Sequence, residues 1–353
     1  MSGSGHEHAK LLSLATAVPP HILWQREVRD AAQLLFAHYP EFGRLSTVFD
    51  TAGIEKRHAV RPMLWYAEPR GWPERTQAYL EGAEDLFVAA AQKALSAAGL
   101  AARDIATIVT VSSTGIATPS LEARVSSRMG FRHNVSRVPV FGLGCAGGVS
   151  GLSIAARLAE ARPGTNVLFV AVELCTLAFR LDEFTKANVV ATALFGDGAA
   201  ACVLNTAGEG LASVEGAGEY TWPDTLDIMG WNVDPKGFGV IFARSIPPFT
   251  EANMRPAVTC ILDQLDLRIG DVERFVCHAG GMKVISALER ALEIPDRSLQ
   301  HERTVLANYG NMSAPTVLFV LEEVLRTRMP ERAVLTAMGP GFTASCLSLR
   351  QAA

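Results

Sequence analysis

Long hydrophobic runs and an excess of basic charge are both missing from this sequence. The longest apolar runs, such as residues 167–172, fall far short of the ~20 residues that span a bilayer, and residues 1–10 are polar rather than signal-like. The 32 Lys and Arg residues are outnumbered by 36 Asp and Glu, so the net charge of −4 gives no basic field to gather nucleic acid. We therefore expect a cytoplasmic protein with no membrane span and no nucleic-acid partner.

Paired cysteines are also missing. The six cysteines are scattered through apolar sequence without a C-x-x-C pair, which predicts neither a metal site nor a disulfide framework. Five of them are expected to be buried and inert, namely Cys175, Cys202, Cys260, Cys277 and Cys346. Cys145 differs from these five because glycines stand on both sides of it.

The 353 residues are 49% hydrophobic, enough for a large core of about two domains. Helical and β-rich stretches alternate, which is typical of an α/β fold. The alternation recurs with a shift of 167 positions (267 − 100 = 167). The matching sets are Leu100, Asp104, Ile105, Ile108 and Val109, and then Leu267, Asp271, Val272, Phe275 and Val276.

Each copy reads as the same series of elements. A helix (86–98; 251–265) precedes a strand, a second helix (146–158; 312–326) and strand (166–172; 333–338) follow, and a glycine turn leads to a last strand (199–204; 342–349). Chance similarity between α/β units is the alternative, but the shared shift favours duplication. We predict a mobile tail at 1–10, related halves at 11–210 and 211–353, and a glycine-rich hinge near 207–218.

Cys145 lies in a glycine-flanked turn between an expected strand and an expected helix, in the sequence VPVFGLGCAGG (138–148). The free N–H groups and the dipole at a helix start favour a thiolate, and the small neighbours leave room for an acyl group. We therefore predict that Cys145 is a nucleophile rather than a buried, inert thiol.

A cysteine nucleophile needs a basic partner and hydrogen-bond donors for an oxyanion. Of the eight histidines, only His278 follows a buried-looking strand and opens a glycine turn. Asn311 precedes the equivalent helix of the second half and is therefore nearly equivalent to Cys145. An asparagine in that place is by itself more often a helix cap. Together with Cys145 and His278 at mirrored turns, Asn311 is predicted to be catalytic.

Five motifs then carry a resemblance to the thiolase-fold condensing enzymes and, among them, to the type III polyketide synthases related to chalcone and stilbene synthase. They are GCAGG (144–148), LFGDGAA (194–200), HAGG (278–281), YGNMS (309–313) and GPG (339–341). The resemblance covers residues 11–350 and implies an α/β fold, a thiolase-like αβαβα sandwich made of two duplicated halves.

The resemblance also implies residue roles. Cys145 would carry the starter and the growing chain as a thioester, while His278 and Asn311 would hold the thioester carbonyl and stabilise the enolate. Phe195 would gate the passage from the CoA tunnel. Acyl-CoA and malonyl-CoA would be the substrates of a homodimer, with no metal, redox cofactor or acyl carrier protein.

The tunnel wall implied by the resemblance contains Ser113, Thr114, Thr118, Ala178 and Trp231. Thr118 and Ala178 replace a methionine and a threonine of plant members, which favours a wider tunnel and medium or long fatty acyl starters. The alternative is that Trp231, near a plant glycine, fills the space and leaves room only for small starters.

Contacts with the CoA phosphates are less evident from the sequence. Plant members have several basic residues in the stretch corresponding to 44–51, where only Arg44 remains. Lys56 and Arg57 lie just beyond it, and a solvated basic pair is their alternative interpretation.

We therefore expect decarboxylative condensation of an acyl-CoA starter with malonyl-CoA, followed by cyclisation to a pyrone or phenolic product of the alkylpyrone or alkylresorcinol kind. One alternative is an initiating ketoacyl-ACP synthase, although its usual His-Gln-Ala-Asn stretch is replaced by residues 278–281. A thiolase would need a second cysteine near 339–341, and none is there. A non-catalytic subunit that binds acyl-CoA is the third alternative, against which the complete set of Cys145, His278 and Asn311 argues.

Overall fold

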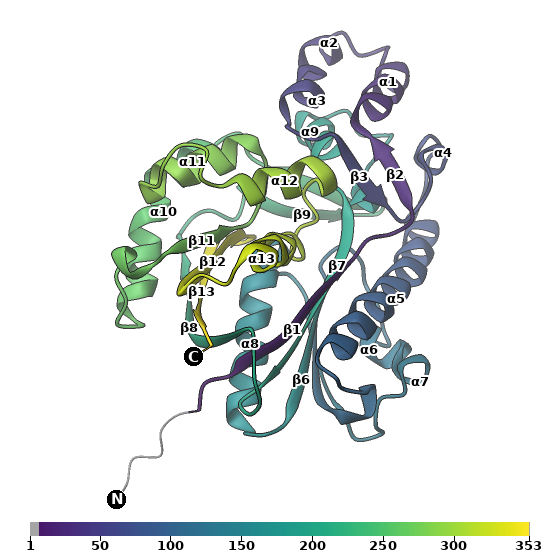
Figure 1. Cartoon of the computed structure of the whole chain (residues 1–353). Helices are drawn as coiled ribbons and strands as arrows, with labels where there is room; N and C mark the ends of the chain where they lie inside the picture. The colour runs from purple at the N-terminus through teal and green to yellow at the C-terminus, as the bar shows by residue number, and fades with distance from the viewer. Residues whose placement is uncertain (1–6, 353) are drawn as a thin grey trace, which may run out of the picture.

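The computed structural model describes residues 7–352 and shows sheets and helices packed in alternating layers (Figure 1). In the first half the strands lie in the order β5–β4–β6–β7–β1. Their bounds are β1 Lys10–Ala17, β4 Ile105–Val111, β5 Ser136–Val140, β6 Asn166–Leu174 and β7 Asp197–Asn205. β6 and β7 are buried along nearly their whole lengths, and their almost continuous runs of apolar residues fit strands covered on both faces.

The second half repeats this order. Its strands lie as β11–β12–β13–β8, with bounds β8 Ala212–Thr221, β11 Arg274–Cys277, β12 Arg332–Gly339 and β13 Thr343–Gln351. Apart from β5, which has no counterpart within residues 7–352, the two halves pair alike. β4 with β6 and β11 with β12 are parallel, and the two pairs that follow in each half are antiparallel. The predicted duplication is therefore present in the pairing pattern. β1 and β8 join the halves into one nine-stranded sheet through the pairs Lys10 with Ser213 and Leu11 with Ala212.

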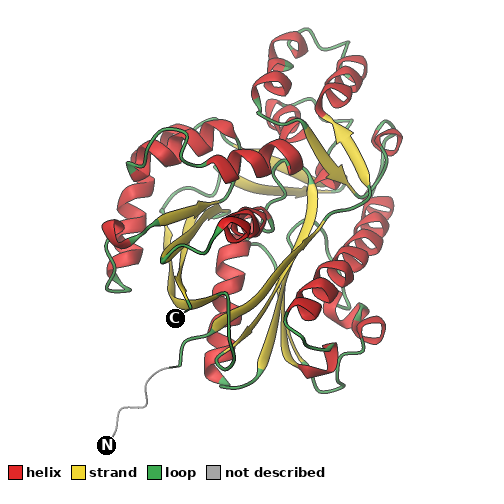
Figure 2. Cartoon of the chain, in the orientation of Figure 1, coloured by secondary structure: helices red, strands yellow, loops and turns green. Residues whose placement is uncertain are grey.

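Two equivalent helices fill the layer between the two halves, α8 (Gly147–Ala161) and α13 (Thr316–Thr327). They approach so closely that a Cβ on Gly148 would lie 2.2 Å from the carbonyl oxygen of Ala314, so only glycine fits there. α5 (Trp72–Ala97) covers the outer face of the first half, and α10 (Ile246–Asp263) and α11 (Met282–Leu292) cover that of the second (Figure 2). This is the expected αβαβα order of layers.

Smaller elements lie near the end of the sheet where β4 and β11 finish. They are β2 (His21–Trp24), α1 (Gln25–Leu35), α2 (Phe42–Leu45), α3 (Thr47–Thr51), β3 (Lys56–Ala59), α4 (Met63–Tyr66), α9 (Lys186–Leu194), β9 (Met229–Asp234), β10 (Gly237–Phe242) and α12 (Gln300–Tyr309). Two short helices, α6 (Leu121–Arg124) and α7 (Ser126–Met129), lie beside α5 and lead into β5 (Figure 1). Short 3-10 turns complete the described chain at η1 (Ala102–Asp104), η2 (Gly144–Ala146), η3 (Cys175–Ala178) and η4 (Ile269–Asp271).

Several sequence expectations need correction. α5 begins at Trp72 rather than at residue 86, with Pro73 in the first turn, where its missing N–H costs nothing. The predicted tail is too long at its end, because Ala9 is fully buried with its N–H bonded to Glu160, and Lys10 already belongs to β1; residues 1–6 of that tail lie outside the described residues. The division of the halves at 210/211 stays a prediction.

The predicted hinge is largely a strand. Gly216 and Gly218 lie inside β8, which pairs with β13. A Cβ on these glycines would come within 2.6 Å of Leu265 and 2.8 Å of Ile261. These two glycines therefore allow α10 and its C-terminal extension to pack closely on the strand, rather than giving the chain a flexible joint.

Candidate active site

Cys145 lies in the 3-10 turn η2, directly before α8. Gly144 has a φ of +49°, and a Cβ there would lie 2.6 Å from the ring of Pro340. A Cβ on Gly339 would likewise lie 2.4 Å from the carbonyl oxygen of Leu143. The glycine turn of the second half therefore packs directly on the cysteine turn of the first, and both need glycine because the two backbones meet there.

Asn311 comes from the second half and reaches Cys145. Its Oδ1 lies 4.0 Å from the Cys145 Sγ and accepts a hydrogen bond from the Ser313 N–H at 2.8 Å, while its Nδ2 donates to the Gly280 carbonyl at 3.2 Å. The backbone of Asn311 is fixed as well, through a bridge to Phe195. The cap residue of α13 is Pro315, so Asn311 is not the cap of that helix.

His278 follows β11, and its N–H donates to the Thr336 carbonyl at 2.8 Å. Both ring nitrogens are buried and have no hydrogen-bond partner among the described residues. A Cβ on Gly280 would lie 3.4 Å from His278 Nε2 and 3.9 Å from Asn311 Nδ2. The two side chains therefore lie within 4 Å of the same point beside Gly280, and the three predicted residues are brought together around Asn311.

Burial of Cys145 disfavours the thiolate that was expected from its place at the start of a helix. It raises the pKa of Cys145 to about 12, and hydrogen bonds to Ser313 and Asn311 lower this pKa only in part. Burial also lowers the pKa of His278 to about 4. Each group taken singly is therefore neutral at pH 7, and a thiolate needs the imidazole as an acceptor for its proton.

Ser113 and Thr114 form the wall behind the cysteine turn. The Ser113 Oγ accepts hydrogen bonds from the N–H groups of Gly142 and Gly144, at 3.1 and 3.3 Å. The Thr114 hydroxyl donates to the buried carboxyl of Glu173 at 2.7 Å. Burial raises the pKa of Glu173 to about 8, although hydrogen bonds from Ser113 and Thr114 lower it. Ser113 thus supports the turn, and Thr114 is bonded to Glu173 in the adjoining strand.

Phe195 directly follows α9, and its ring lies against that of Trp231 in an edge-on contact, with centroids 6.2 Å apart. The Trp231 Nε1 donates to the Ser113 carbonyl at 2.8 Å. Trp231 therefore occupies space beside Phe195. Ala178 is buried in η3, and Thr118 is exposed in the loop after β4.

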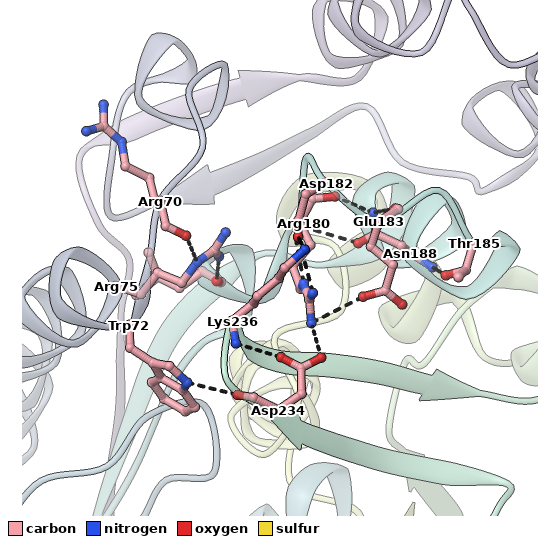
Figure 3. A network of polar contacts seen from close by, with 11 residues as sticks. Arg70, Trp72, Arg75, Arg180, Asp182, Glu183, Thr185, Asn188, Asp234 and Lys236 are labelled. Carbon is pink, nitrogen blue, oxygen red and sulfur yellow. Dashed lines mark hydrogen bonds and ion pairs between the residues drawn. The ribbon is translucent and has the colours of Figure 1, made fainter.

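The hairpin of β9 and β10, which carries Trp231, is held by a network of charges (Figure 3). The guanidinium of Arg180 is nearly buried and pairs with Asp234 at 2.8 Å, while the Trp72 Nε1 donates to the Asp234 carbonyl at 3.0 Å. Burial works against the charge of Asp182, but Lys236 and Arg180 outweigh it and lower its pKa to about 2. These contacts tie the hairpin that carries Trp231 to Arg180 and to Trp72 at the start of α5.

A cavity of about 620 Å³ opens between α2, α3, α9 and the turn before α11, and it includes Gly280 and Gly281 beside His278. We call it the cationic pocket because four basic residues line it, namely Arg44, Lys186, Arg244 and Lys283. Burial, and then repulsion from Arg244, Lys283 and Arg44, lowers the pKa of Lys186, as expected when cations converge.

Sequence reasoning found only Arg44 of this set. A usable signal was the position of Lys283, two residues after the HAGG motif; Lys186 and Arg244 stand in regions with no motif. The interpretation of Arg57 as a solvated residue is wrong. Its side chain is 2% exposed, and its Nη1 donates to the carbonyls of Thr192 and Phe195. The expectation that Cys260 is buried is also wrong, because its side chain is exposed.

Among residues 7–352, no group of three His, Cys, Asp or Glu side chains is arranged to hold a metal ion. Within the same range, no helix combines the length and apolar character needed to cross a bilayer.

A cysteine at the turn before a central helix, facing His and Asn side chains from a duplicated second half, defines a thiolase-fold condensing enzyme. Residues 1–208 match the model of the N-terminal domain of chalcone and stilbene synthases, and residues 214–353 match that of the C-terminal domain. The chain therefore belongs to the chalcone and stilbene synthase family, the type III polyketide synthases.

Individual relatives agree with this assignment. The chain is 38% identical over 344 residues to 1,3,6,8-tetrahydroxynaphthalene synthase of Streptomyces peucetius subsp. caesius, covering 95% of this chain and 91% of that one. It is 28% identical over 352 residues to the α-pyrone synthesis polyketide synthase-like Pks18 of Mycobacterium tuberculosis, covering 95% and 89%. The crystal structure of the tetrahydroxynaphthalene synthase of Streptomyces coelicolor A3(2) superposes with a TM-score of 0.92 at 30% identity, over 98% of this chain and all of that one.

Proposed function

We propose that this chain loads an acyl group from CoA onto Cys145, extends it with malonyl-CoA by decarboxylative condensation, and cyclises the product to a pyrone or a phenolic ring. The observation that carries the proposal is the approach of Asn311 Oδ1 to within 4.0 Å of the Cys145 Sγ, beside a buried His278 whose ring nitrogens have no partner within residues 7–352. Buried polar atoms without a hydrogen-bond partner cost free energy unless a substrate supplies that partner.

In the loading step, His278 accepts the proton of Cys145, and the thiolate attacks the carbonyl carbon of the acyl-CoA. The new bond joins that carbon to the Cys145 sulfur. The bond to the sulfur of CoA breaks, and the departing thiolate takes the proton back from His278. The released CoA leaves an acyl group on Cys145 and a neutral imidazole.

In the condensation step, the malonyl thioester loses CO₂, and the electron pair of the broken bond forms an enolate. N–H groups of His278 and Asn311 stabilise the enolate oxygen, as donors placed where charge develops. The enolate carbon attacks the acyl carbonyl on Cys145, the bond to sulfur breaks, and the thiolate is regenerated. The enzyme then holds a chain longer by two carbons, attached to CoA.

The cationic pocket is proposed to hold the CoA phosphates. Arg44, Lys186, Arg244 and Lys283 come from four separate elements and point into one opening, and repulsion between cations costs free energy that a polyanion removes. The pocket extends to Gly280, next to His278, so a pantetheine arm entering there reaches the catalytic side chains. A solved relative, CsyB, was crystallised with CoA-SH.

A homodimer is also part of the proposal. β5 is an edge strand of the nine-stranded sheet, and its residues are half-buried or exposed. Beside it lie two exposed apolar side chains, Ile116 at 56% and Phe141 at 57% exposure. An edge strand flanked by exposed apolar groups favours pairing with a second copy. Thr118, in the same loop as Ile116, would then face the partner subunit.

The proposal is tested by incubating the purified chain with malonyl-CoA and a series of acyl-CoA starters, without any carrier protein, and analysing the products by mass spectrometry. Polyketide products formed under these conditions support it and exclude the ketoacyl-ACP synthase alternative. Absence of turnover until an acyl carrier protein is added would overturn it.

The role of the cationic pocket has its own control. Lys283→Glu should raise the KM for malonyl-CoA at least about tenfold, because a cation near phosphate is replaced by an anion. Arg26→Glu, the same kind of charge change on the exposed side of α1, should leave KM within twofold.

A further inference from the structure

Arg57 is a buried cation that the proposed chemistry does not use. It lies in β3, opposite Leu23 of β2, and is 2% exposed. Burial lowers the pKa of its guanidinium to about 10, which the nearby Asp197 offsets only in part, so the group stays charged at pH 7. A charge inside a protein costs free energy unless other groups pair with it. The groups that Arg57 contacts therefore indicate its role.

The hydrogen-bond partners of Arg57 are backbone carbonyls at the end of α9. Its Nη1 donates to the carbonyl of Thr192 at 2.5 Å and to that of Phe195 at 3.0 Å. α9 ends at Leu194, and Phe195 is the cap residue that follows it. Carbonyls at the C-terminal end of a helix carry partial negative charge and favour a cation. The Nε and Nη2 atoms have no partner among the described residues, so Nη1 alone makes these bonds.

The same end of α9 is bonded to the backbone of Asn311. The Asn311 N–H donates to the Leu194 carbonyl at 2.8 Å, and the Gly196 N–H donates to the Asn311 carbonyl at 3.0 Å. These two bonds form the bridge between Phe195 and Asn311. Residues 194–196 are therefore held by Asn311 through two hydrogen bonds and by Arg57 through the carbonyl of Phe195.

The aliphatic part of the Arg57 side chain packs on both sides of this bridge. A Cβ on Gly310, which has a φ of +68°, would lie 2.8 Å from the Arg57 Cγ. A Cβ on Gly196 would lie 3.4 Å from the Arg57 Cβ. Gly196 belongs to the first half of the chain and Gly310 to the second. Arg57 therefore contacts both halves at the point where their backbones meet.

This point lies directly beside the nucleophile. The Oδ1 of Asn311 is 4.0 Å from the Cys145 Sγ, and the backbone N–H and carbonyl of Asn311 are both bonded to residues 194–196. A shift of that segment would carry the backbone of Asn311 with it. The place of the Asn311 amide relative to Cys145 thus depends on the segment that Arg57 holds.

We propose that Arg57 is a positioning residue for the condensation step, which fixes residues 194–196 and, through them, the amide of Asn311. The inference rests on the proposed function, in which Asn311 acts on the enolate. The alternative is that Arg57 only closes the end of α9 and stabilises the fold. A positioning residue affects extension and spares starter loading, whereas a loss of stability alone changes both steps alike.

The first test measures loading and extension separately, by single-turnover mass spectrometry. Arg57→Met keeps an apolar stem but removes the donor. Extension should fall at least about tenfold with loading within twofold, because a misplacement of roughly 1 Å can cost up to about 10²-fold. Arg57→Lys should extend within about threefold of wild type, since the arginine uses a single nitrogen and an ammonium has donors for both carbonyls.

Arg255→Met is the matched control. The Nη1 of Arg255 donates to the carbonyl of Leu292 at 3.1 Å, and Leu292 is the last residue of α11. The variant therefore removes the same kind of contact, between an arginine and the end of a helix, at a place with no bond to Asn311. Loading and extension should both stay within twofold of wild type.

A double variant tests whether Arg57 acts through Asn311. Arg57→Met combined with Asn311→Ala should extend no more than about twofold more slowly than Asn311→Ala alone, because changes that act through one group are not additive. Multiplication of the two losses would show that Arg57 acts independently of Asn311 and would overturn the proposal. Equal losses of loading and extension in Arg57→Met, or an Arg57→Lys variant as slow as Arg57→Met, would also overturn it.

If Arg57→Met fails to fold, by its circular dichroism and melting curve, Arg57→Gln replaces it. Its side chain is polar but shorter, so it leaves no buried charge and does not span the distance to both carbonyls. Extension should again fall while loading is spared, and an unchanged ratio of the two rates counts against the proposal.

Hydrogen exchange keeps this proposal separate from the proposed function. The N–H groups of Gly196 and Asn311 should exchange at least about tenfold faster in Arg57→Met than in wild type or Arg255→Met, because the bridge opens more often. If wild type condenses no starter but this pattern holds, the positioning contact stands and the synthase assignment fails. If wild type condenses its starter and the exchange of both groups is unchanged in Arg57→Met, the positioning role fails and the assignment stands.

Discussion

Ser112 and His278 occupy the same place in the two halves, directly after β4 and directly after β11. Each has its backbone N–H bonded to a neighbouring strand. The Ser112 hydroxyl bonds that of Tyr79 at 2.7 Å, whereas the ring nitrogens of His278 have no partner in the described chain. One copy of the duplicated unit thus uses this position for structure, and the proposed function uses the other for a substrate.

The turns before the two central helices differ in the same way. Cys145 leads straight into α8, and the Ser113 hydroxyl beside it is used to support the turn. Asn311 precedes α13 by several residues, and its amide is oriented by Gly280 and Ser313. The proposed function assigns the nucleophile to the first half and the groups that hold oxygen atoms to the second half.

The largest effect is expected when the equivalent positions of this comparison are changed in parallel. His278→Gln should lower turnover by about 10³-fold, within the range for removing an acid–base group. Ser112→Ala should leave turnover within threefold and reduce the free energy of unfolding by about 1 kcal/mol, because the Tyr79 hydroxyl loses its partner. Steady-state kinetics and urea unfolding of both variants provide the measurement. Equal losses of turnover would remove the contrast between the halves.

His278 should also control the reactivity of Cys145. Without the imidazole, the thiol has no acceptor for its proton, and burial, only partly offset by hydrogen bonds to Ser313 and Asn311, keeps its pKa high. Alkylation of Cys145 by iodoacetamide at pH 7 should therefore be at least tenfold slower in His278→Gln than in wild type. An unchanged rate would mean that the helix start suffices to form the thiolate.

Asn311→Ala should lower condensation by about 10²-fold while leaving starter loading nearly intact, because one donor to the enolate is lost. Asn308→Ala, three residues earlier, removes an amide that bonds only within α12 and is the matched control. Single-turnover mass spectrometry separates loading from extension. Normal extension in Asn311→Ala would reduce this residue to a support for the Ser313 turn.

Glu173 sharpens the comparison within the sheet, because the second half has Met338 at the equivalent place near the end of β12. Burial raises the pKa of Glu173 to about 8, so the folded chain keeps this proton while the unfolded chain releases it near pH 4.5. The stability that depends on this proton is present below pH 4.5 and is lost as the pH rises through 8.

Glu173→Gln should remove this dependence. Wild type and variant should differ little at pH 5, and the variant should gain about 2 kcal/mol relative to wild type by pH 8. Urea unfolding at the two pH values gives the difference. A constant difference would show that Glu173 is ionised in the fold throughout this range.

The smallest effect is expected at the edge of the first half. Phe141→Glu should weaken dimerisation at least about tenfold, because a charge replaces an apolar side chain beside the free edge of β5. Leu226→Glu, at an 81% exposed leucine elsewhere on the surface, is the control. Light scattering over a concentration series measures both, and equal dimer stability in the two variants would place the interface elsewhere.

Local pattern was enough to predict much of the fold and the turns at which Cys145, His278 and Asn311 come together. The shift of 167 positions anticipates the repeated strand order, and the glycine turns mark Cys145 and Asn311 because close backbone approach requires glycine at fixed places. The sequence motifs therefore predict the points where the two halves touch.

Features that depend on the burial of single side chains could not be predicted in this way. Arg57 looks like a surface residue in the sequence, yet the structure buries it against two carbonyls. Lys186 and Arg244 share a pocket with Arg44 only because α9 and the segment after β10 meet there. Burial also reverses the expected charge preference of Cys145, which no local pattern reveals.

The central claim is that Cys145 of the first half carries the acyl group and that the second half acts on it. Wild type, Cys145→Ser and Asn311→Ala should each be incubated with acyl-CoA, analysed by intact mass and digested to locate the acyl group. We predict the starter mass on the peptide containing Cys145 in wild type and in Asn311→Ala, no such mass in Cys145→Ser, and extension by malonyl-CoA at the full rate only in wild type. Acylation of Cys145→Ser at the wild-type rate, or an acyl group on Cys175 instead, would contradict the account.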